Sequence, residues 1–178
     1  NRMDLPNIHR AYELVHRLDP IHPSYLVITQ PEGYESFGRC CDVLAVDTYP
    51  ISKKFPIEDV GRNLARAYLV SDDDLPVWHC GQLFNWPADR LPTPGEHRYM
   101  TYRAAFEGVR GMLWFTYRWE GKSLPQADPR LWEVHLQTLR ELRDLEPYLL
   151  AEGLGEEAEV HSAKGNVRAR VRKAQDGS

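Results

Sequence analysis

Residues 42–47, Asp-Val-Leu-Ala-Val-Asp, are the stretch that decides the fold of this 178-residue chain. Four apolar residues follow one another without a polar break, and Thr48-Tyr49-Pro50 ends the run. A strand buried in a parallel sheet has this continuous apolar character, whereas a half-buried strand alternates. Amphipathic patterns of helical length lie on both sides, at 7–18 and 57–70. The stretch therefore predicts a strand between two helices.

Three further apolar runs of strand length repeat this arrangement, at 25–29, 75–80 and 112–116. Helices are expected at 7–18 with Asn7 as N-cap, at 32–40, at 57–70, at 93–109 and at 128–150. Thr93 and Glu96 form a capping-box pattern around Pro94, which marks one helix start. Helices that alternate with continuous apolar strands predict an α/β fold whose parallel sheet is covered on both faces.

Two α/β architectures fit this order, a doubly wound open sheet and part of a (β/α)8 barrel. No glycine-rich phosphate loop follows any run, which argues against the nucleotide-binding form of the open sheet. A full barrel takes about 250 residues, and the four strand–helix units here occupy about half that length. We therefore predict that residues 1–152 are the C-terminal half of a (β/α)8 TIM barrel, with strands five to eight.

The chain changes character after Gly155. Val167, Ala169 and Val171 share one parity against three arginines, which is typical of a half-buried strand with a solvated basic face. A hairpin is expected across 164–166, so residues 153–178 are predicted to start a β-sandwich-like domain or an extension. Because the chain opens on a helix and ends within this pattern, we expect both ends to be cut from a longer protein.

Composition argues against several classes of protein. Apolar residues make up 42% and charged residues 27%, which are globular values. A net charge of −4 gives no pull toward nucleic acid, and no run approaches the roughly 18 apolar residues of a membrane span. Three cysteines are too few for a disulfide framework, and no metal-ligand spacing is present. We expect no metal, cofactor, nucleic acid or membrane as partner, and the compartment stays open because any signal peptide would lie upstream.

Candidate functional residues are sought just beyond the strand ends, where both architectures collect them. If Leu44 and Val46 face the outer helices, Asp47 faces inward at the rim. Asp47 is therefore the candidate catalytic carboxylate. The alternative is a cap that stabilises the following turn.

Polar and aromatic side chains at the strand ends are the candidate substrate ligands. Gln82 points into the same mouth by parity, and its amide can bond sugar hydroxyls unless it satisfies the turn itself. Glu120 is either a second carboxylate or a surface partner of Lys122. Five aromatic residues at or just past strand ends suit stacking on pyranose rings, with core packing as the alternative: Tyr49, Phe84, Trp86, Tyr117 and Trp119.

The segment Pro-Val-Trp-His-Cys-Gly-Gln-Leu-Phe-Asn-Trp at 76–86 resembles the seventh strand of glycoside hydrolase barrels of the β-galactosidase and cellulase type. Tyr-Arg-Trp-Glu-Gly at 117–121 resembles the end of their eighth strand, and 18–23 and 42–50 resemble the segments that enter strands five and six. The resemblance covers about residues 5–150, and the tail resembles the β-sandwich that often follows such barrels.

This resemblance implies a hydrolase that acts on a carbohydrate, with Asp47 as base or electrostatic partner. It implies that strands one to four, with the general acid/base glutamate that ends strand four, lie upstream of residue 1. Catalytic relatives carry a nucleophilic glutamate where this chain has Gln82, and an amide cannot form the glycosyl ester. The alternative is a carbohydrate-binding barrel without hydrolase activity. Without its expected partner, the N-terminal half-barrel, the segment is expected to be inactive.

Overall fold

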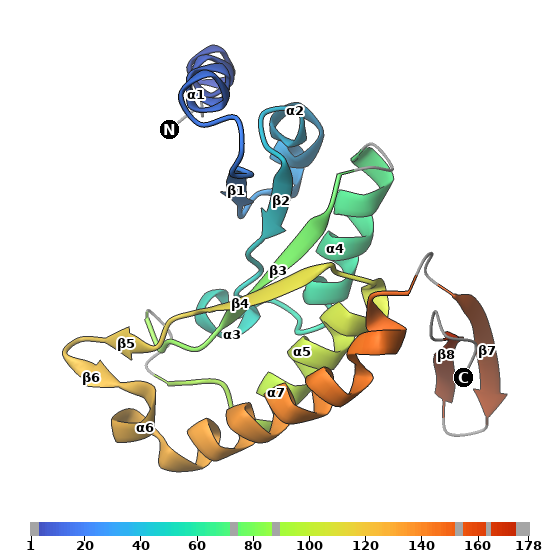
Figure 1. The fold of residues 1–178 in the computed structure, drawn as a ribbon. Coiled ribbons are helices and arrows are strands. Elements are labelled where there is room, and N and C mark those ends of the chain that lie inside the picture. Colours follow the sequence, from blue (N-terminus) through green and yellow to red (C-terminus); the bar gives the residue numbers. More distant parts are fainter. Residues whose placement is uncertain (1–3, 72–74, 87–89, 152–154, 163–164, 174–178) are drawn as a thin grey trace.

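The computed structural model describes residues 4–71, 75–86, 90–151, 155–162 and 165–173 (Figure 1). Its helices are α1 (Leu5–Leu18), α2 (Tyr34–Gly38), α3 (Pro50–Lys53), α4 (Asp59–Val70), α5 (Pro94–Glu107), α6 (Leu124–Ala127) and α7 (Pro129–Leu149), with a 3-10 turn at Pro31–Gly33. Its strands are β1 (Tyr25–Ile28), β2 (Val43–Val46), β3 (Val77–Gln82), β4 (Gly111–Phe115), β5 (Arg118–Trp119), β6 (Lys122–Ser123), β7 (Glu156–Ser162) and β8 (Gly165–Val171). The alternation of strands and helices confirms a mixed α/β fold.

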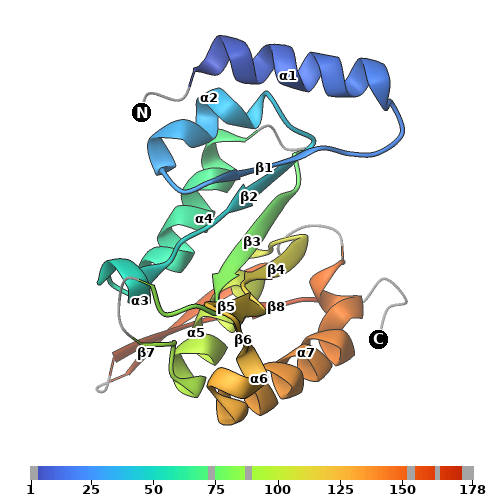
Figure 2. The same ribbon diagram turned by 90° about the vertical axis from the view of Figure 1, so that its left-hand side faces the viewer.

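Strands β1 to β4 form one parallel sheet in which the spatial order follows the chain order. Helices α2, α4, α5 and α7 all lie on one face of this sheet (Figure 1). The opposite face, which Figure 2 turns toward the viewer, carries none of the described helices. Among the described residues, helices therefore cover one face of the sheet and leave the other without a helix layer.

Strand β2 is apolar on both faces although only one face is covered by helices. Its residues on the other face, Val43 and Ala45, are small enough to lie beneath larger side chains of the neighbouring strands. Val43 and Ala45 point to that face, where Tyr25 of β1 and Trp78 of β3 are their register partners. The two large rings stack above β2 with their centroids 6.4 Å apart, so Ala45 is 0% exposed while Tyr25 is 57% exposed. Aromatic side chains from the neighbouring strands therefore cover β2 on the face that carries no described helix.

The main hydrophobic core lies between the sheet and the helices on its covered face. Leu44 and Val46 of β2 point into it, as the parity of the strand predicts. Helix α4 contributes Val60, Leu64 and Ala67, and α5 contributes Met100 and Ala104. These residues are spaced three or four apart on each helix, which places them on one helical face.

Strands β3 and β4 are joined by two reciprocal contacts between a tryptophan and a glycine. Trp78 lies across Gly111, and Trp114 lies across Gly81; each pair is in register, and the two pairs occupy opposite faces of the sheet. A Cβ atom at Gly111 would lie 2.5 Å from the Trp78 ring, and one at Gly81 would lie 2.6 Å from the Trp114 ring. Both positions therefore require glycine.

The helix starts predicted at 93 and 128 are confirmed. Thr93 and Glu96 form the capping box of α5, and the Asp128 side chain accepts a hydrogen bond from the backbone amide of Leu131 at the start of α7. Helix α1 instead begins after Asp4, and Asn7 donates its side-chain amide to Asp4 Oδ2 at 2.6 Å. Asn7 lies inside the helix, so its prediction as N-cap is wrong.

Helix α1 is attached through hydrogen bonds to one carboxylate and through Ile8, which packs against the main core. None of its residues is buried. Asp42, just before β2, accepts hydrogen bonds from the Tyr12 hydroxyl at 3.0 Å and from the Ser24 backbone amide at 2.7 Å. His16 Nε2 lies 3.0 Å from the same carboxylate. Polar contacts at Asp42 therefore supply much of the attachment of α1.

Strands β7 and β8 form the predicted antiparallel hairpin, although residue 164 of the expected turn lies outside the described residues. Arg168 is exposed, but Arg170 and Arg172 are not part of a solvated face, which corrects the prediction for these two residues. Arg170 donates to the carbonyl of Phe106 and lies over the Phe106 ring, and Arg172 Nη1 donates to the carbonyl of Leu149 at 3.0 Å. These carbonyls end α5 and α7, where a helix favours a cation. That residues 153–178 start a further domain stays a prediction.

Among the described residues, no helix has the length and apolar character needed to cross a membrane.

Candidate functional site

The carboxyl ends of the four parallel strands meet at one edge of the sheet, where the predicted site residues lie. Asp47 follows β2, Gln82 ends β3, and Phe115, the register partner of Gln82, ends β4. Parallel strands bring their ends to one edge, so residues distant in sequence become neighbours. Two pockets open at this edge, and we describe them in turn.

The first pocket, of about 200 Å³, contains Asp47 and Tyr49 together with Thr29, Lys53 and Asn63. Asp47 is 8% exposed, and its Oδ1 atom has no hydrogen-bond partner among the described residues. Burial raises the pKa of this carboxyl, although a hydrogen bond with Thr29 and the nearby Lys53 cation act in the opposite direction. A carboxyl with a raised pKa and a free oxygen is suited to proton transfer.

Four aromatic rings form a wall next to this pocket: Tyr49, Phe84, Phe115 and Trp119. The Tyr49 and Phe84 rings meet edge to face at 4.9 Å, and the Phe84 and Phe115 rings do so at 5.6 Å. The Trp119 ring lies 6.0 Å from Phe84 and 6.2 Å from Phe115. The Tyr49 hydroxyl lies 3.2 Å from Cys80 Sγ, which anchors the wall to the middle of β3. We call these four residues the aromatic wall.

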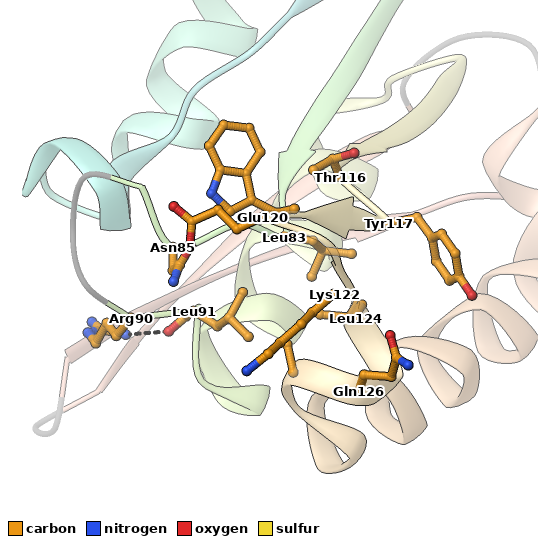
Figure 3. Close-up of a pocket in the computed structure, with 12 residues that line it drawn as sticks. Leu83, Asn85, Arg90, Leu91, Thr116, Tyr117, Glu120, Lys122, Leu124 and Gln126 are labelled. Atoms are coloured by element: carbon orange, nitrogen blue, oxygen red, sulfur yellow. Dashed lines mark hydrogen bonds between the residues drawn. The ribbon is translucent and has the colours of Figure 1, made fainter.

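The second pocket, of about 380 Å³, is lined by Trp119 of the aromatic wall. Figure 3 shows the other side chains that line it. Leu83, Leu91 and Leu124 give it an apolar floor. Its polar lining consists of Asn85, Arg90, Thr116, Tyr117, Glu120, Lys122 and Gln126. An apolar floor with a polar rim matches the two kinds of surface that a sugar ring presents.

A tight turn between β5 and β6 presents two charges to this second pocket. Glu120 and Gly121 have positive φ angles of 48° and 80°, as a two-residue hairpin turn requires, and Trp119 pairs with Lys122 across the hairpin. Arg90 is neutralised by Glu96, which lies 2.7 Å from Arg90 Nη1. Glu120 and Lys122 form no ion pair with another described residue, so both charges remain for a ligand.

Gln82 is placed differently from the expectation of a side chain that reaches into the mouth. It is 0% exposed, and its Oε1 atom accepts a hydrogen bond from the Ser52 amide at 3.3 Å. Its Nε2 atom donates to the Phe84 carbonyl at 3.1 Å. The amide therefore joins the start of α3 to the strand-to-loop turn of β3. Its role as a sugar ligand stays a prediction.

The structure divides the predicted site residues into two groups and leaves two outside them. Asp47 and Tyr49 share the first pocket, and Tyr117, Trp119 and Glu120 share the second. Gln82 is buried, and Trp86 is 61% exposed and lines neither pocket. The aromatic wall connects the two groups, because Tyr49 and Trp119 both belong to it.

Several side chains of the site were not singled out from the sequence, among them Phe115, Asn85 and Lys53. Phe115 could have been found from the sequence, because it lies at the end of the apolar run 112–116, where site residues were sought. In the structure it is the register partner of Gln82. Asn85 and Lys53 carry no such signal, because they reach the pockets through loop and helix geometry.

No group of three or more histidine, cysteine, aspartate or glutamate side chains within the described ranges could hold a metal ion. Comparisons with models of known protein families and with curated proteins give no match.

Proposed function

We propose that this chain forms the C-terminal half of a (β/α)8 barrel. The strand order β1-β2-β3-β4 and the location of α2, α4, α5 and α7 on one face support this proposal, because barrel strands follow one another with all helices outside. The other face is apolar, with Tyr25, Val27 and Phe115 at 57%, 40% and 45% exposure. An N-terminal half-barrel that pairs with β1 and β4 is the proposed partner that would cover this face.

The proposed ligand of the strand-end edge is a carbohydrate. The observation that carries this proposal is the aromatic wall, which stands between a pocket with a buried carboxyl and a pocket with an apolar floor. Flat rings next to amide and charged groups stack on the apolar face of a sugar while the polar groups bond its hydroxyls. Tyr117, Trp119 and Glu120 would contact one sugar unit, and Tyr49 and Asp47 the next.

The proposed reaction is hydrolysis of a glycosidic bond in the complete barrel, as the resemblance to glycoside hydrolases implies. Asp47 would act as base or electrostatic partner, and the acid would come from the upstream half. Gln82 cannot serve as a nucleophile, so an inverting reaction with a water between the two carboxyls is the form this chain could support.

A second candidate function, carbohydrate binding without hydrolysis, is favoured by the hydrogen bonds of Gln82. Its Nε2 atom donates to the Phe84 carbonyl. A glutamate at this position would turn a carboxylate oxygen toward that carbonyl, and the site is thus built for an amide. Such a barrel would use the same two pockets and the same aromatic wall.

The test of binding uses calorimetry with oligosaccharides on this chain joined to its natural upstream residues. Trp119→Ala is expected to weaken binding at least tenfold, because it removes a ring from both the aromatic wall and the second pocket. Tyr148→Ala, on the outer helix α7 and 37% exposed, is the matched control and should leave affinity unchanged. Equal affinity of the Trp119 variant and the control would contradict the proposed site.

The test of hydrolysis compares aryl-glycoside turnover of the same protein with that of Asp47→Asn. Loss of a proton-transferring group lowers turnover by about 10²–10⁴-fold. Because burial raises the pKa of Asp47, its charged form is disfavoured in the fold, so the neutral variant should be slightly more stable at pH 7. Unchanged turnover would remove Asp47 from catalysis, and glycan binding without turnover would establish the second candidate.

A further inference from the structure

A cluster of buried histidines lies on the helix-covered face of the sheet, outside the site described above. His97 of α5 and His135 of α7 are 1% and 7% exposed, and His97 Nε2 lies 3.2 Å from His135 Nδ1. The His135 ring meets the Trp114 ring edge to face at 4.9 Å and lies 5.6 Å from the Trp132 ring. The pair is thus a contact between two helices within a shell of indoles.

This histidine pair lies next to the floor of the second pocket. Leu83 and Leu124 of that floor belong to the same hydrophobic cluster as Leu131 of α7, and Trp114 and Trp132 pack against this cluster. The same two indoles contact His135. A displacement of α7 would therefore move the floor of the pocket.

The groups around the pair offer no compensation for an added proton. The hydrogen bond between the two imidazoles needs a lone pair on one nitrogen and a proton on the other. The titratable groups nearest the pair are His79 of β3, which is 0% exposed, and the Arg98 cation of α5. Strand β4 and helix α7 contribute the uncharged rings of Trp114 and Trp132. Arg98 is itself paired with Glu141 of α7, at the exposed side of the helix contact.

We infer that this pair makes the second pocket sensitive to acid: proton uptake by the buried imidazoles separates the start of α7 from α5 and dismantles the apolar floor. A buried cation without a counter-charge is costly, and opening to water relieves that cost. The lowered pKa of His97, to about 4, and the lowered pKa of His135 agree with burial as the cause. The effect on a ligand rests on the proposed carbohydrate site, whereas the structural change does not.

The test is hydrogen–deuterium exchange of this chain between pH 7.5 and 4.5, corrected for the intrinsic pH dependence of exchange. Amides at 129–138 are expected to lose at least tenfold protection across this range, while amides of α4 keep theirs. The variant His97→Gln/His135→Gln retains a donor and an acceptor but does not titrate. It should lose clearly less α7 protection than the parent chain at pH 4.5, because among the buried histidines of the described residues only His79 still takes up a proton in it. His9→Gln, on the exposed surface of α1, is the control and should behave as the parent chain.

Equal loss of α7 protection in the double variant and the parent chain would overturn the inference. If the double variant does not fold, the test is an NMR titration of the His97 and His135 imidazole protons in the parent chain. Titration of both rings near pH 6.5 without loss of α7 protection would overturn the inference. Titration together with that loss would support it. Neither the exchange measurement nor the imidazole titration requires a bound sugar. An acid-dependent α7 in a chain that binds no glycan at any pH would support this inference and contradict the proposed function.

Discussion

The two edges of the parallel sheet differ in how their helices are held. At the β4 edge, α7 buries Leu131, His135 and Thr138 against the sheet and α5. At the β1 edge, α1 has an equally clear apolar stripe but buries none of its residues. Leu14, Val15 and Leu18 of that stripe are 45%, 45% and 75% exposed. Helix α7 is attached by buried apolar packing, whereas α1 is attached by the hydrogen bonds of Asp42 and by the partly buried Ile8.

An amphipathic pattern therefore predicts a helix with an apolar face, but it does not predict which part of the protein covers that face. The α1 stripe lies beside β1, which has no further neighbour among the described strands. In the proposed barrel, a strand that precedes α1 would pair with β1 and cover the stripe. One additional strand beside β1 would therefore explain both the exposed stripe of α1 and the unpaired edge of β1.

The largest expected effect separates the two helices by core packing. Leu131→Ala on α7 should lower the free energy of unfolding by about 3 kcal/mol, because Leu131 is 0% exposed and its removal leaves a cavity. Leu14→Ala on α1 should change it by less than about 0.5 kcal/mol, since Leu14 is half exposed. Urea denaturation of both variants checks this. Equal losses would break the comparison between the two edges.

A second effect of comparable size is a loss of stability in acid, which we expect at the α7 side of the sheet before the α1 side. Burial lowers the pKa of His97 and of His79 from 6.5 to about 4, so the folded state binds fewer protons than the unfolded state in that range. The free energy of unfolding should therefore fall as the pH drops from about 6.5 to 4, by about 3 kcal/mol for one such histidine. Urea titrations at stepped pH measure this fall.

The α1 edge should respond at lower pH. Hydrogen bonds from Ser24 and Tyr12 lower the pKa of Asp42 below 3.8, although burial acts against them. A carboxyl with a lowered pKa loses its stabilising effect only as the pH falls through its folded pKa. Exchange protection of α1 should thus persist through the range in which α7 weakens. Loss of α1 protection before that of α7 would contradict this order.

The smallest effect concerns Asp42 itself. Asp42→Ala removes an acceptor shared by Tyr12, His16 and Ser24. Because the Asp42 side chain is partly exposed and water can replace these bonds, the expected net loss is about 1 kcal/mol. Amides of 5–18 should exchange at least fivefold faster while those of α7 stay unchanged. Asp19→Ala is the matched control, because Asp19 bonds only residues of its own loop, Ile21 and His22. Unchanged exchange of α1 in the Asp42 variant would show that other contacts hold it.

Local signals in the sequence predicted the elements well, because each depends on residues close together in the chain. The capping box of Thr93 and Glu96 set the start of α5 without any tertiary contact. The apolar run 43–46 likewise predicted β2. The sequence did not reveal that Tyr25 and Trp78 stack above β2, because these two residues come from two neighbouring strands and no single apolar run contains both.

The site was harder to predict because it depends on loops that fold back on the strand ends. Parity placed Asp47 at the rim, but the fate of Gln82 depends on the Phe84 carbonyl, whose direction follows from the turn after β3. Arg170 and Arg172 looked solvated by alternation, yet they reach the ends of two helices that precede them by more than twenty residues. Such contacts have no periodic signature.

The two tryptophan–glycine pairs between β3 and β4 have a consequence for assembly. A slip of β4 by one residue in either direction would remove each glycine from its ring and drive a Cβ into an indole on both faces at once. Strand β4 pairs with β3 alone among the described strands, so its other edge presents a ladder of donors and acceptors with a locked phase. A strand that joins this edge therefore pairs with backbone groups whose positions relative to β3 are already fixed.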